Sequence, residues 1–279
     1  MTARTTLTPD RRLLRAASSE RYAREGWLPL AMEDGVVTVA TSSPLVGRRR
    51  SRVEAEIGAP IRVRTVSQRD LIAAYMSVYG AEVADLAADG LYRKNPAMSA
   101  RHVLSRGQVV ALVVALVVIA AAAVLWPLVT LMVVVGVASV IFLASTLFKF
   151  EVALRGSRFD LVDRVTAEEV AALDDAELPI YTVLVPVFRE ARVVGRLVDN
   201  LGRLDYPADR LEVIILVEEE DDETREAIAR SEPPENFVIL TIPKGAPQTK
   251  PRACNAGLEV ARGEYLVIYD AEDAPEPDQ

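Results

Sequence analysis

The 279-residue chain has a net charge of −8 and a pI near 5.0, and this acidity argues against nucleic acid as a partner of the whole chain. Hydrophobic residues make up 51% of the sequence, and the mean hydropathy is +0.18 although 26% of the residues are charged. The apolar residues must therefore be concentrated in part of the chain. The single cysteine, Cys254, excludes an internal disulfide, and the single histidine, His102, excludes a His-rich zinc site and a Ser-His-Asp triad within the soluble parts. The first residues contain no early apolar core, so they do not form a secretory signal peptide.

Residues 1–80 have the pattern of a small α+β module. The turn residues Glu33-Asp34-Gly35 separate a short extended piece from an apolar run, which is typical of a hairpin. Ser67 followed by Asp70 resembles a capping box and opens a helix. We expect helices over Arg11–Arg24, Leu45–Ile57 and Ser67–Tyr79, and strands over Trp27–Leu30, Val36–Ala40 and Ile61–Val66.

Three stretches of this module, YAREGWLPL, GVVTVATSSPL and IGAPIRVRTVSQRDLIAAYMSVYG, resemble the N-terminal domain of type II secretion and pilus ATPases. The resemblance covers Tyr22–Gly80 and implies a docking or regulatory module that recruits a protein partner. Some members of that family bind cyclic di-GMP through tandem motifs. No convincing copy of those motifs is present, so this activity is not inferred.

Residues 81–107 are predicted to form a polar linker that ends in a basic cluster. A long apolar stretch follows this linker. No charged residue occurs from Gly107 to Phe148. One helix of that length would measure about 60 Å at ~1.5 Å per residue, about twice the ~30 Å core of a bilayer. Trp126-Pro127 is the natural break between two spans. Within residues 108–148 we therefore predict a transmembrane hairpin formed by Gln108–Trp126 and Leu128–Phe148.

Basic residues flank the hairpin on both sides. The positive-inside rule places both soluble parts in the cytoplasm, with the protein in the cytoplasmic (inner) membrane. The spans contain no polar side chain that would suggest an ion path, so they are expected to act as an anchor. The flanking residues are Arg101 and Arg106 before the hairpin and Lys149, Arg155 and Arg158 after it.

After a connector over residues 149–179, residues 180–279 alternate between apolar strands and amphipathic helices. Continuous apolar strands separated by helices indicate a parallel α/β sheet. The expected strands are Tyr181–Val185, Leu211–Val217, Phe237–Ile242 and Tyr265–Tyr269, and the expected helices are Glu190–Leu204, Asp222–Arg230 and Pro251–Ala261.

Each predicted strand is followed by polar residues, and in a parallel sheet all of these residues meet at one edge. Carboxylates gathered there repel one another unless a cation lies between them, and lysine and arginine side chains can bind phosphate. The chain has neither a G-x-G-x-x-G nor a G-x-x-x-x-G-K-[ST] motif, which argues against a redox dinucleotide and a P-loop. Carboxylates for a divalent metal together with cations for phosphate meet the requirements of sugar transfer from a nucleotide-sugar. The strand-end clusters are Pro186, Arg189 and Glu190; Glu218–Asp222; Lys244, Gly245, Lys250 and Arg252; and Asp270, Glu272 and Asp273.

The stretches YTVLVPVFRE, LDYPADRLEVIILVEEEDDET and TKPRACNAGLEVARGEYLVIYDAEDAPEPDQ look like the start of a cellulose-synthase-like family 2 glycosyltransferase. The resemblance covers Ile180–Gln279. It implies a GT-A fold, a nucleoside-diphosphate-sugar donor, Mg²⁺ or Mn²⁺ as cofactor, and inversion at the anomeric carbon.

By motif position, the resemblance also implies a set of site residues. Pro186 and Glu190 line the nucleotide pocket, and Glu219, with Glu218 beside it, stands where the family has the aspartate that contacts the base. Lys250 lies near the diphosphate. Asp270 and Glu272 form a D-x-D-like metal pair, with Asp273 as a substitute for Glu272. Glutamate replaces aspartate at two of these places, which changes the reach of the ligand oxygens, and Cys254 is expected only to pack.

In the family, the catalytic base and an acceptor motif follow the D-x-D pair. The resemblance thus implies that this chain holds the donor-binding half of a larger membrane transferase, contains no catalytic residue and is inactive alone. A non-catalytic membrane adaptor is the alternative from another class. A glycolipid synthase or a polyprenyl-phosphate sugar transferase is an enzymatic alternative to a polysaccharide polymerase.

Overall fold

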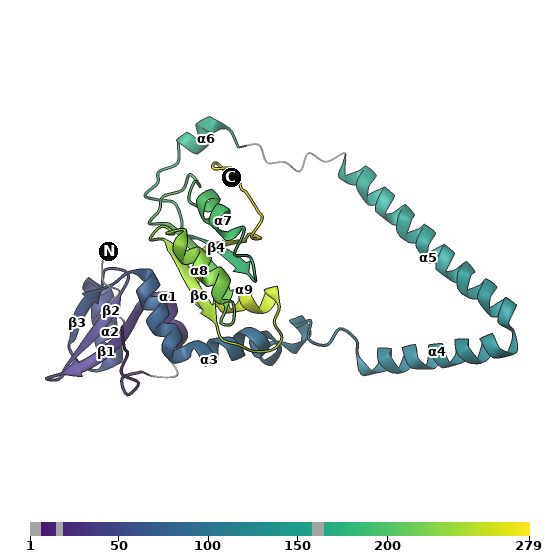
Figure 1. The fold of residues 1–279 in the computed structure, drawn as a ribbon, viewed down its shortest axis with the longest axis horizontal. Helices are drawn as coiled ribbons and strands as arrows, with labels where there is room; N and C mark the ends of the chain where they lie inside the picture. The colour runs from purple at the N-terminus through teal and green to yellow at the C-terminus, as the bar shows by residue number, and fades with distance from the viewer. Residues whose placement is uncertain (1–6, 15–18, 158–164) are drawn as a thin grey trace. The chain divides into compact units, whose positions relative to one another are not determined.

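The structure is a computed structural model that describes residues 7–14, 19–157 and 165–279 (Figure 1). The chain forms two compact units. One unit combines Met1–Met98 with Asp174–Gln279, and the other is Ser99–Leu173. The amino-terminal module and the α/β segment, which are far apart in sequence, therefore belong to the same unit.

The amino-terminal module is a three-stranded sheet with helices, as predicted. Strands β1 and β2 form the expected antiparallel hairpin, and β3 pairs parallel to β2 after the helical crossover α2. Of the predicted helix over 11–24, residues 11–13 form a turn, residues 19–24 belong to α1, and residues 15–18 lie outside the described residues. The elements are α1 (Ser19–Glu25), β1 (Trp27–Glu33), β2 (Val36–Thr41), α2 (Gly47–Ile57) and β3 (Ile61–Thr65).

Helix α3 (Gln68–Lys94) is the longest element of this unit. The Ser67 side chain accepts a hydrogen bond from the Asp70 N–H, so the predicted cap is present. The helix runs 15 residues beyond the expected end at Tyr79 and stops only at Asn95, before Pro96. Tyr79, Val83 and Ala87 are buried along one face, and this packing holds residues that look like a polar linker in a helical conformation.

Residues 174–279 form a four-stranded sheet in the order β6-β5-β4-β7, and every neighbouring pair is parallel. This confirms the predicted parallel α/β sheet. Helix α7 is shorter than expected because turns replace its first and last residues. The elements are β4 (Tyr181–Val187), α7 (Val194–Leu201), β5 (Leu211–Glu218), α8 (Asp222–Arg230), β6 (Phe237–Ile242), α9 (Lys250–Leu258) and β7 (Tyr265–Ile268).

The two faces of this sheet are covered by different parts of the chain. Alternate strand residues such as Val185 and Ile215 pack with α7 and α8. The residues between them, such as Leu184 and Leu216, belong to one apolar cluster with α9, α3 and the core of the amino-terminal module. Helix α3 packs against β6 and α9 (Figure 1). The Arg69 guanidinium fixes this contact by donating to the carbonyls of Pro233, Pro234 and Phe237 at 3.0–3.2 Å.

Strand β7 differs from the buried fourth strand that its apolar sequence predicts. It pairs only with β4, at one side of the sheet. Tyr265 is 54% exposed and Ile268 is 45% exposed. An apolar run indicates a strand, but it does not specify whether the strand lies inside the sheet or at its edge.

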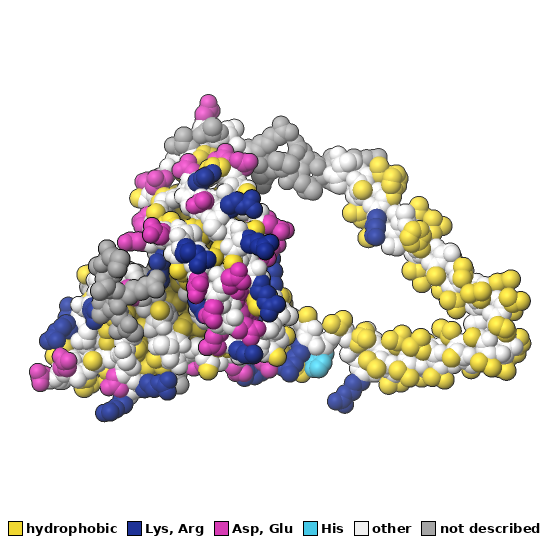
Figure 2. Space-filling view, in the orientation of Figure 1, with side chains coloured by type: hydrophobic (Ala, Val, Ile, Leu, Met, Phe, Trp, Pro, Cys, Tyr) yellow, Lys and Arg dark blue, Asp and Glu magenta, His cyan; other side chains and the backbone are white. Residues whose placement is uncertain are grey.

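The second unit contains α4 (Arg106–Leu125), α5 (Pro127–Gly156) and α6 (Ala167–Ala171). The first two helices cover the two predicted apolar segments with the break at Trp126, and a Ser105–Gln108 capping box starts α4. Neither helix has a buried residue, and Figure 2 shows their apolar side chains along the visible face of both helices. By length and composition, α4, α5 and α3 could each cross a membrane. Helix α3 differs from the other two because it is partly buried, whereas the apolar stretches of α4 and α5 are not. Arg158 of the predicted basic flank lies outside the described residues.

Gly263 fixes the entry to β7. Its N–H donates to the Thr182 hydroxyl at 2.9 Å, and a Cβ at this position would lie 2.6 Å from the Thr182 backbone nitrogen. We predict that Gly263→Ala lowers the free energy of unfolding by about 1–3 kcal/mol, because backbone cannot move aside cheaply. Gly195→Ala in α7 is the matched control, since its Cβ would meet nothing within 4 Å and alanine favours helix. Urea denaturation of both variants tests this, and equal stability of the two would contradict the clash.

Candidate functional site

The carboxyl ends of β4, β5, β6 and β7 lie at one edge of the sheet, because all four strands are parallel. The predicted meeting of the strand-end clusters is thus confirmed. Successive strands are added on one side of β4 up to β6, and the chain then returns to the other side of β4 for β7. Ligands of open α/β sheets bind in the crevice at such a reversal.

A cavity of about 260 Å³ opens at this edge, beside the start of α9. Three of the predicted nucleotide-binding residues, Pro186, Glu218 and Lys250, line it together. The walls are mostly apolar and the polar groups are few, a composition common in small-molecule sites. The lining consists of Pro186, Val187, Phe188, Leu216, Glu218, Gln248, Thr249, Lys250 and Ala253.

Glu218 is the carboxylate of this cavity. It ends β5 and is buried, and both of its oxygens lie 3.3 Å from Nη1 of Arg252 in the first turn of α9. Burial raises the pKa of Glu218, the Arg252 charge opposes that shift, and the charge of Glu220 adds to it. Of the two neighbouring glutamates predicted to contact the base, Glu218 lines the cavity and Glu219 does not.

The next two carboxylates bind the loop between β6 and α9 instead. Glu219 accepts a hydrogen bond from the Lys244 N–H at 3.1 Å. Glu220 accepts from Gln248 Nε2 at 2.8 Å and forms an ion pair with the Lys244 ammonium at 3.1 Å. The hydrogen bonds from Gln248 and Lys244 lower the pKa of Glu220. These contacts hold the loop that carries Gln248 and Thr249 against the end of β5.

The loop after β4 is held by the start of α8. Asp221 caps α8 by accepting from the Thr224 N–H at 3.2 Å, and it also accepts from the Arg189 N–H at 2.5 Å. The Thr224 hydroxyl accepts from the Glu190 N–H at 3.0 Å. Arg189 has a φ of +59°, a conformation that costs free energy and persists where such contacts fix it. Glu190, predicted to line the nucleotide pocket, is held beside the cavity and is not among its lining residues.

The predicted metal-binding residues follow β7. Asp270 forms an ion pair with the ammonium of Lys250, so these two predicted residues meet. The Asp273 carboxylate accepts from the Asp270 N–H at 2.7 Å and closes the turn, and Glu272 is exposed. Within residues 7–14, 19–157 and 165–279, no three acidic, histidine or cysteine side chains are grouped to hold a metal ion. A metal here would therefore take at most one or two protein carboxylates and complete its shell with ligand and water oxygens.

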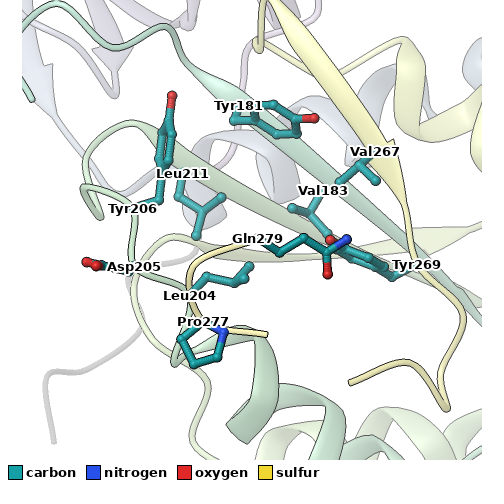
Figure 3. A pocket seen from close by; sticks show the side chains of 10 residues that line it. All are labelled: Tyr181, Val183, Leu204, Asp205, Tyr206, Leu211, Val267, Tyr269, Pro277 and Gln279. Carbon is teal, nitrogen blue, oxygen red and sulfur yellow. The ribbon is translucent and has the colours of Figure 1, made fainter. Parts of the chain in front are cut away.

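A second cavity, of about 190 Å³, is lined by residues of β4, β5 and β7 from the face of the sheet that packs with α7 and α8 (Figure 3). Aromatic and aliphatic side chains, among them Tyr181, Val183 and Tyr269, surround it together with the tail residues Pro277 and Gln279. Asp205 and the terminal Gln279 are its other polar contributors, and it contains no paired cation and carboxylate. The charged strand-end edge, and not this cavity, has the chemistry expected of a nucleotide site.

Sequence reasoning assigned no role to several residues of the site. Val187, Phe188, Gln248, Thr249 and Ala253 line the cavity without any motif that singles them out. Asp221 is one of five consecutive acidic residues, so its role as the N-cap of α8 is not evident from composition. An aspartate just before a predicted helix is nevertheless a recognisable capping signal. Cys254 is buried as predicted, and burial raises the pKa of its thiol.

The Asp221 carboxylate is expected to stabilise the site in a pH-dependent way. Burial acts to raise its pKa, but the hydrogen bonds from Arg189 and Thr224 outweigh burial and lower it. This stabilisation is present above the unfolded pKa of about 3.9 and is lost as the pH falls through the lower folded value. We predict that Asp221→Asn lowers the free energy of unfolding by about 1–3 kcal/mol at pH 7, and that the difference shrinks below about pH 4.

Urea denaturation across pH 3–7 measures this difference. Asp222→Asn is the control, because the Asp222 carboxylate is 78% exposed and pairs only with Arg225 at the surface. A pH-independent loss in Asp221→Asn would contradict the role of the ionised carboxylate.

Residues 182–279 match glycosyl transferase family 2, and residues 3–85 match the MshEN domain. Curated relatives include the probable glycosyltransferase YdaM of Bacillus subtilis (strain 168), which is 31% identical over 102 residues, or 36% of this chain and 24% of that protein. Another is the dolichyl N-acetyl-alpha-D-glucosaminyl phosphate 3-beta-D-2,3-diacetamido-2,3-dideoxy-beta-D-glucuronosyltransferase of Methanococcus voltae, 26% identical over 97 residues, or 35% of this chain and 30% of that protein. This chain thus spans about a quarter to a third of the length of these relatives.

Two solved glycosyltransferases are also similar. The mannosyltransferase PcManGT of Pyrobaculum calidifontis, solved with GDP-Man and Mn²⁺, is 28% identical with a TM-score of 0.36, over 50% of this chain and 38% of that one. Glucosyl-3-phosphoglycerate synthase of Mycobacterium tuberculosis, solved with Mn²⁺, UDP and phosphoglyceric acid, is 18% identical with a TM-score of 0.32, over 42% of this chain and 40% of that one. The family matches identify residues 182–279 as a family 2 glycosyltransferase segment and residues 3–85 as an MshEN domain.

Proposed function

We propose that this chain is the donor-binding part of a membrane-anchored glycosyltransferase that transfers a sugar from a nucleoside-diphosphate sugar to a glycan or lipid acceptor. The observation that carries the proposal is the convergence of Pro186, Glu218 and Lys250 on one cavity, with Asp270 paired to Lys250. The match of residues 182–279 to a glycosyltransferase family supports it.

Each part of a nucleotide-sugar has a chemical counterpart at this edge. The apolar walls formed by Val187, Phe188 and Leu216 suit the flat face of a base. A carboxylate such as Glu218 accepts hydrogen bonds from base or ribose donors. The Lys250 ammonium suits a phosphate oxygen, because it is a compact charge on a flexible stem.

A divalent cation fits the carboxylates after β7. Asp270 and Glu272 are exposed on one short turn and would hold Mg²⁺ or Mn²⁺, with Asp273 as a substitute for Glu272. The Asp270 carboxylate already binds a cationic group in the form of Lys250. When bound, the metal would neutralise the charge that develops on the diphosphate as the sugar leaves. Inversion at the anomeric carbon is proposed from the family resemblance alone.

The acceptor is proposed to be a glycan or a lipid-linked sugar. One curated relative is named for transfer to a dolichyl phosphate-linked sugar, which supports the lipid acceptor. A multi-pass anchor in the cytoplasmic membrane, formed by α4 and α5 in contact with the lipid bilayer, would keep the donor edge near such an acceptor. The amino-terminal module is proposed to contact a protein partner.

We predict that the full chain binds UDP or GDP in the presence of Mn²⁺. Asp270→Ala is expected to weaken this binding about 10–100-fold, the usual cost of losing a metal-site contact. Asp209→Ala is the matched control, since Asp209 is an exposed carboxylate before the amino end of β5. Calorimetry on detergent-solubilised protein, with and without EDTA, measures the affinities.

Equal affinity in Asp270→Ala and wild type would reject the metal assignment. Failure of the wild-type chain to bind either nucleotide would favour the non-catalytic adaptor over the transferase.

The anchor predicts a defined topology for the hairpin. In a Cys254→Ala background, Trp126→Cys should react with a membrane-impermeant maleimide added outside intact cells. Val103→Cys and Ser157→Cys, on the two sides of the hairpin, should react only after the cells are opened. Labelling of Val103→Cys in intact cells would contradict the assignment of both soluble parts to the cytoplasm.

A further inference from the structure

We propose that Arg252 is a positioning residue for nucleotide binding, which fixes Glu218 and the loop of residues 243–249 from beneath the cavity. The inference rests on the proposed function and assigns a role to a side chain that is not among the lining residues of the cavity. Arg252 lies in the first turn of α9, two residues after Lys250.

The Arg252 guanidinium is buried between two parts of the site. The residue is 2% exposed, and its Nη1 lies 3.3 Å from both carboxylate oxygens of Glu218. Its Nη2 donates to the Pro243 carbonyl at 2.6 Å. One cation therefore joins the end of β5 to the start of the loop that follows β6.

The loop is shaped around this guanidinium. A Cβ on Gly245 would lie 2.7 Å from Arg252 Nη2, so the backbone at Gly245 lies closer to the guanidinium than a residue with a side chain would allow. The same loop provides the Lys244 N–H that binds Glu219 and the Gln248 amide that binds Glu220. Gln248 and Thr249 then line the cavity. Two consecutive carboxylates, Glu219 and Glu220, and two residues of the cavity wall thus depend on one loop, and Arg252 supports that loop.

The arrangement is poorly explained by stability alone. Arg252 Nε is buried without a hydrogen-bond partner among the described residues, and an unsatisfied buried donor is costly. A buried ion pair is also a weak source of stability, because desolvation offsets the attraction, whereas it can specify one geometry. The geometry specified here is that of the only carboxylate among the described residues that line the cavity, Glu218.

The chain offers a matched control at the other edge of the same sheet. Glu212 is buried and accepts from Arg262 Nε at 2.9 Å, which gives a second arginine–glutamate ion pair near the amino end of β5, with the Arg262 side chain 20% exposed and that of Glu212 2% exposed. Arg262 does not line the nucleotide cavity. A role in stability alone would make Arg252 and Arg262 equivalent, whereas a positioning role would separate them.

The test compares Arg252→Gln, Arg252→Lys and Arg262→Gln in the full chain, with UDP and GDP as the probes in the presence of Mn²⁺. Calorimetry measures the dissociation constants, and thermal unfolding measures stability. We expect both glutamine variants to lower the melting temperature. We expect only Arg252→Gln to weaken nucleotide binding, by about tenfold or more, with partial rescue in Arg252→Lys. An equal loss or no loss of affinity in the two glutamine variants would overturn the inference.

Two further measurements keep the test decisive. Gly245→Ala displaces the guanidinium without removing its charge, so it should weaken binding even if Arg252→Gln fails to fold, and unchanged affinity in Gly245→Ala would count against the inference. The pH profile of binding should also move. Without Arg252, burial and the Glu220 charge raise the pKa of Glu218 further, and Lys250 is the one cation left among the described residues that line the cavity. As the pH is lowered, affinity should therefore begin to fall at a higher pH than in wild type. A wild-type chain that binds neither nucleotide would instead refute the proposed function itself.

Discussion

The structure depends on one constraint: a parallel sheet must be covered on both of its faces. In residues 174–279 one face is covered by α7 and α8, but the other face carries only α9 from the same segment. Helix α3 supplies the missing cover, and the apolar cluster runs without a break from the amino-terminal sheet to Leu184 and Leu216. The MshEN domain and the glycosyltransferase segment are for this reason one packed unit and not two bodies joined by a tether.

Helix α9 connects this packing to the proposed chemistry. Its first turn carries Lys250 and Arg252 at the strand-end edge, and one turn later Asn255 donates to the Ala87 carbonyl of α3 at 3.0 Å. The support of the strand-end cavity and the contact with α3 therefore lie on the same short helix. Packed elements transmit displacement because protein interiors are close-packed, so the position of α3 bears directly on the positions of Lys250 and Arg252.

The sequence determines the parallel sheet and its polar edge because both follow from local patterns: apolar runs, helical spacing, and the rule that parallel strands end together. What it leaves open depends on tertiary contact. The polar outer surface of α3 beyond Tyr79 looks like a linker until its buried face is seen against β6 and α9. Strand β7 looks buried until its place at the side of the sheet is known. The sequence offers no reason to choose between the neighbouring residues Glu218 and Glu219. The ion pair with Arg252, 34 positions later in the chain, identifies Glu218 as the carboxylate that faces the cavity.

The edge contains two kinds of charge pair, and their burial assigns them different roles. The Arg252–Glu218 pair is almost wholly enclosed, with side chains 2% and 8% exposed, so separating it would leave a charge buried without a partner. The Lys250–Asp270 pair is 48% and 55% exposed, and exposed pairs contribute little free energy. A phosphate could therefore compete for Lys250, and a metal ion for Asp270, at small cost. The buried Arg252–Glu218 pair would then hold the shape of this edge while Lys250 and Asp270 exchange partners. A site for a nucleotide-sugar and a metal ion needs both properties.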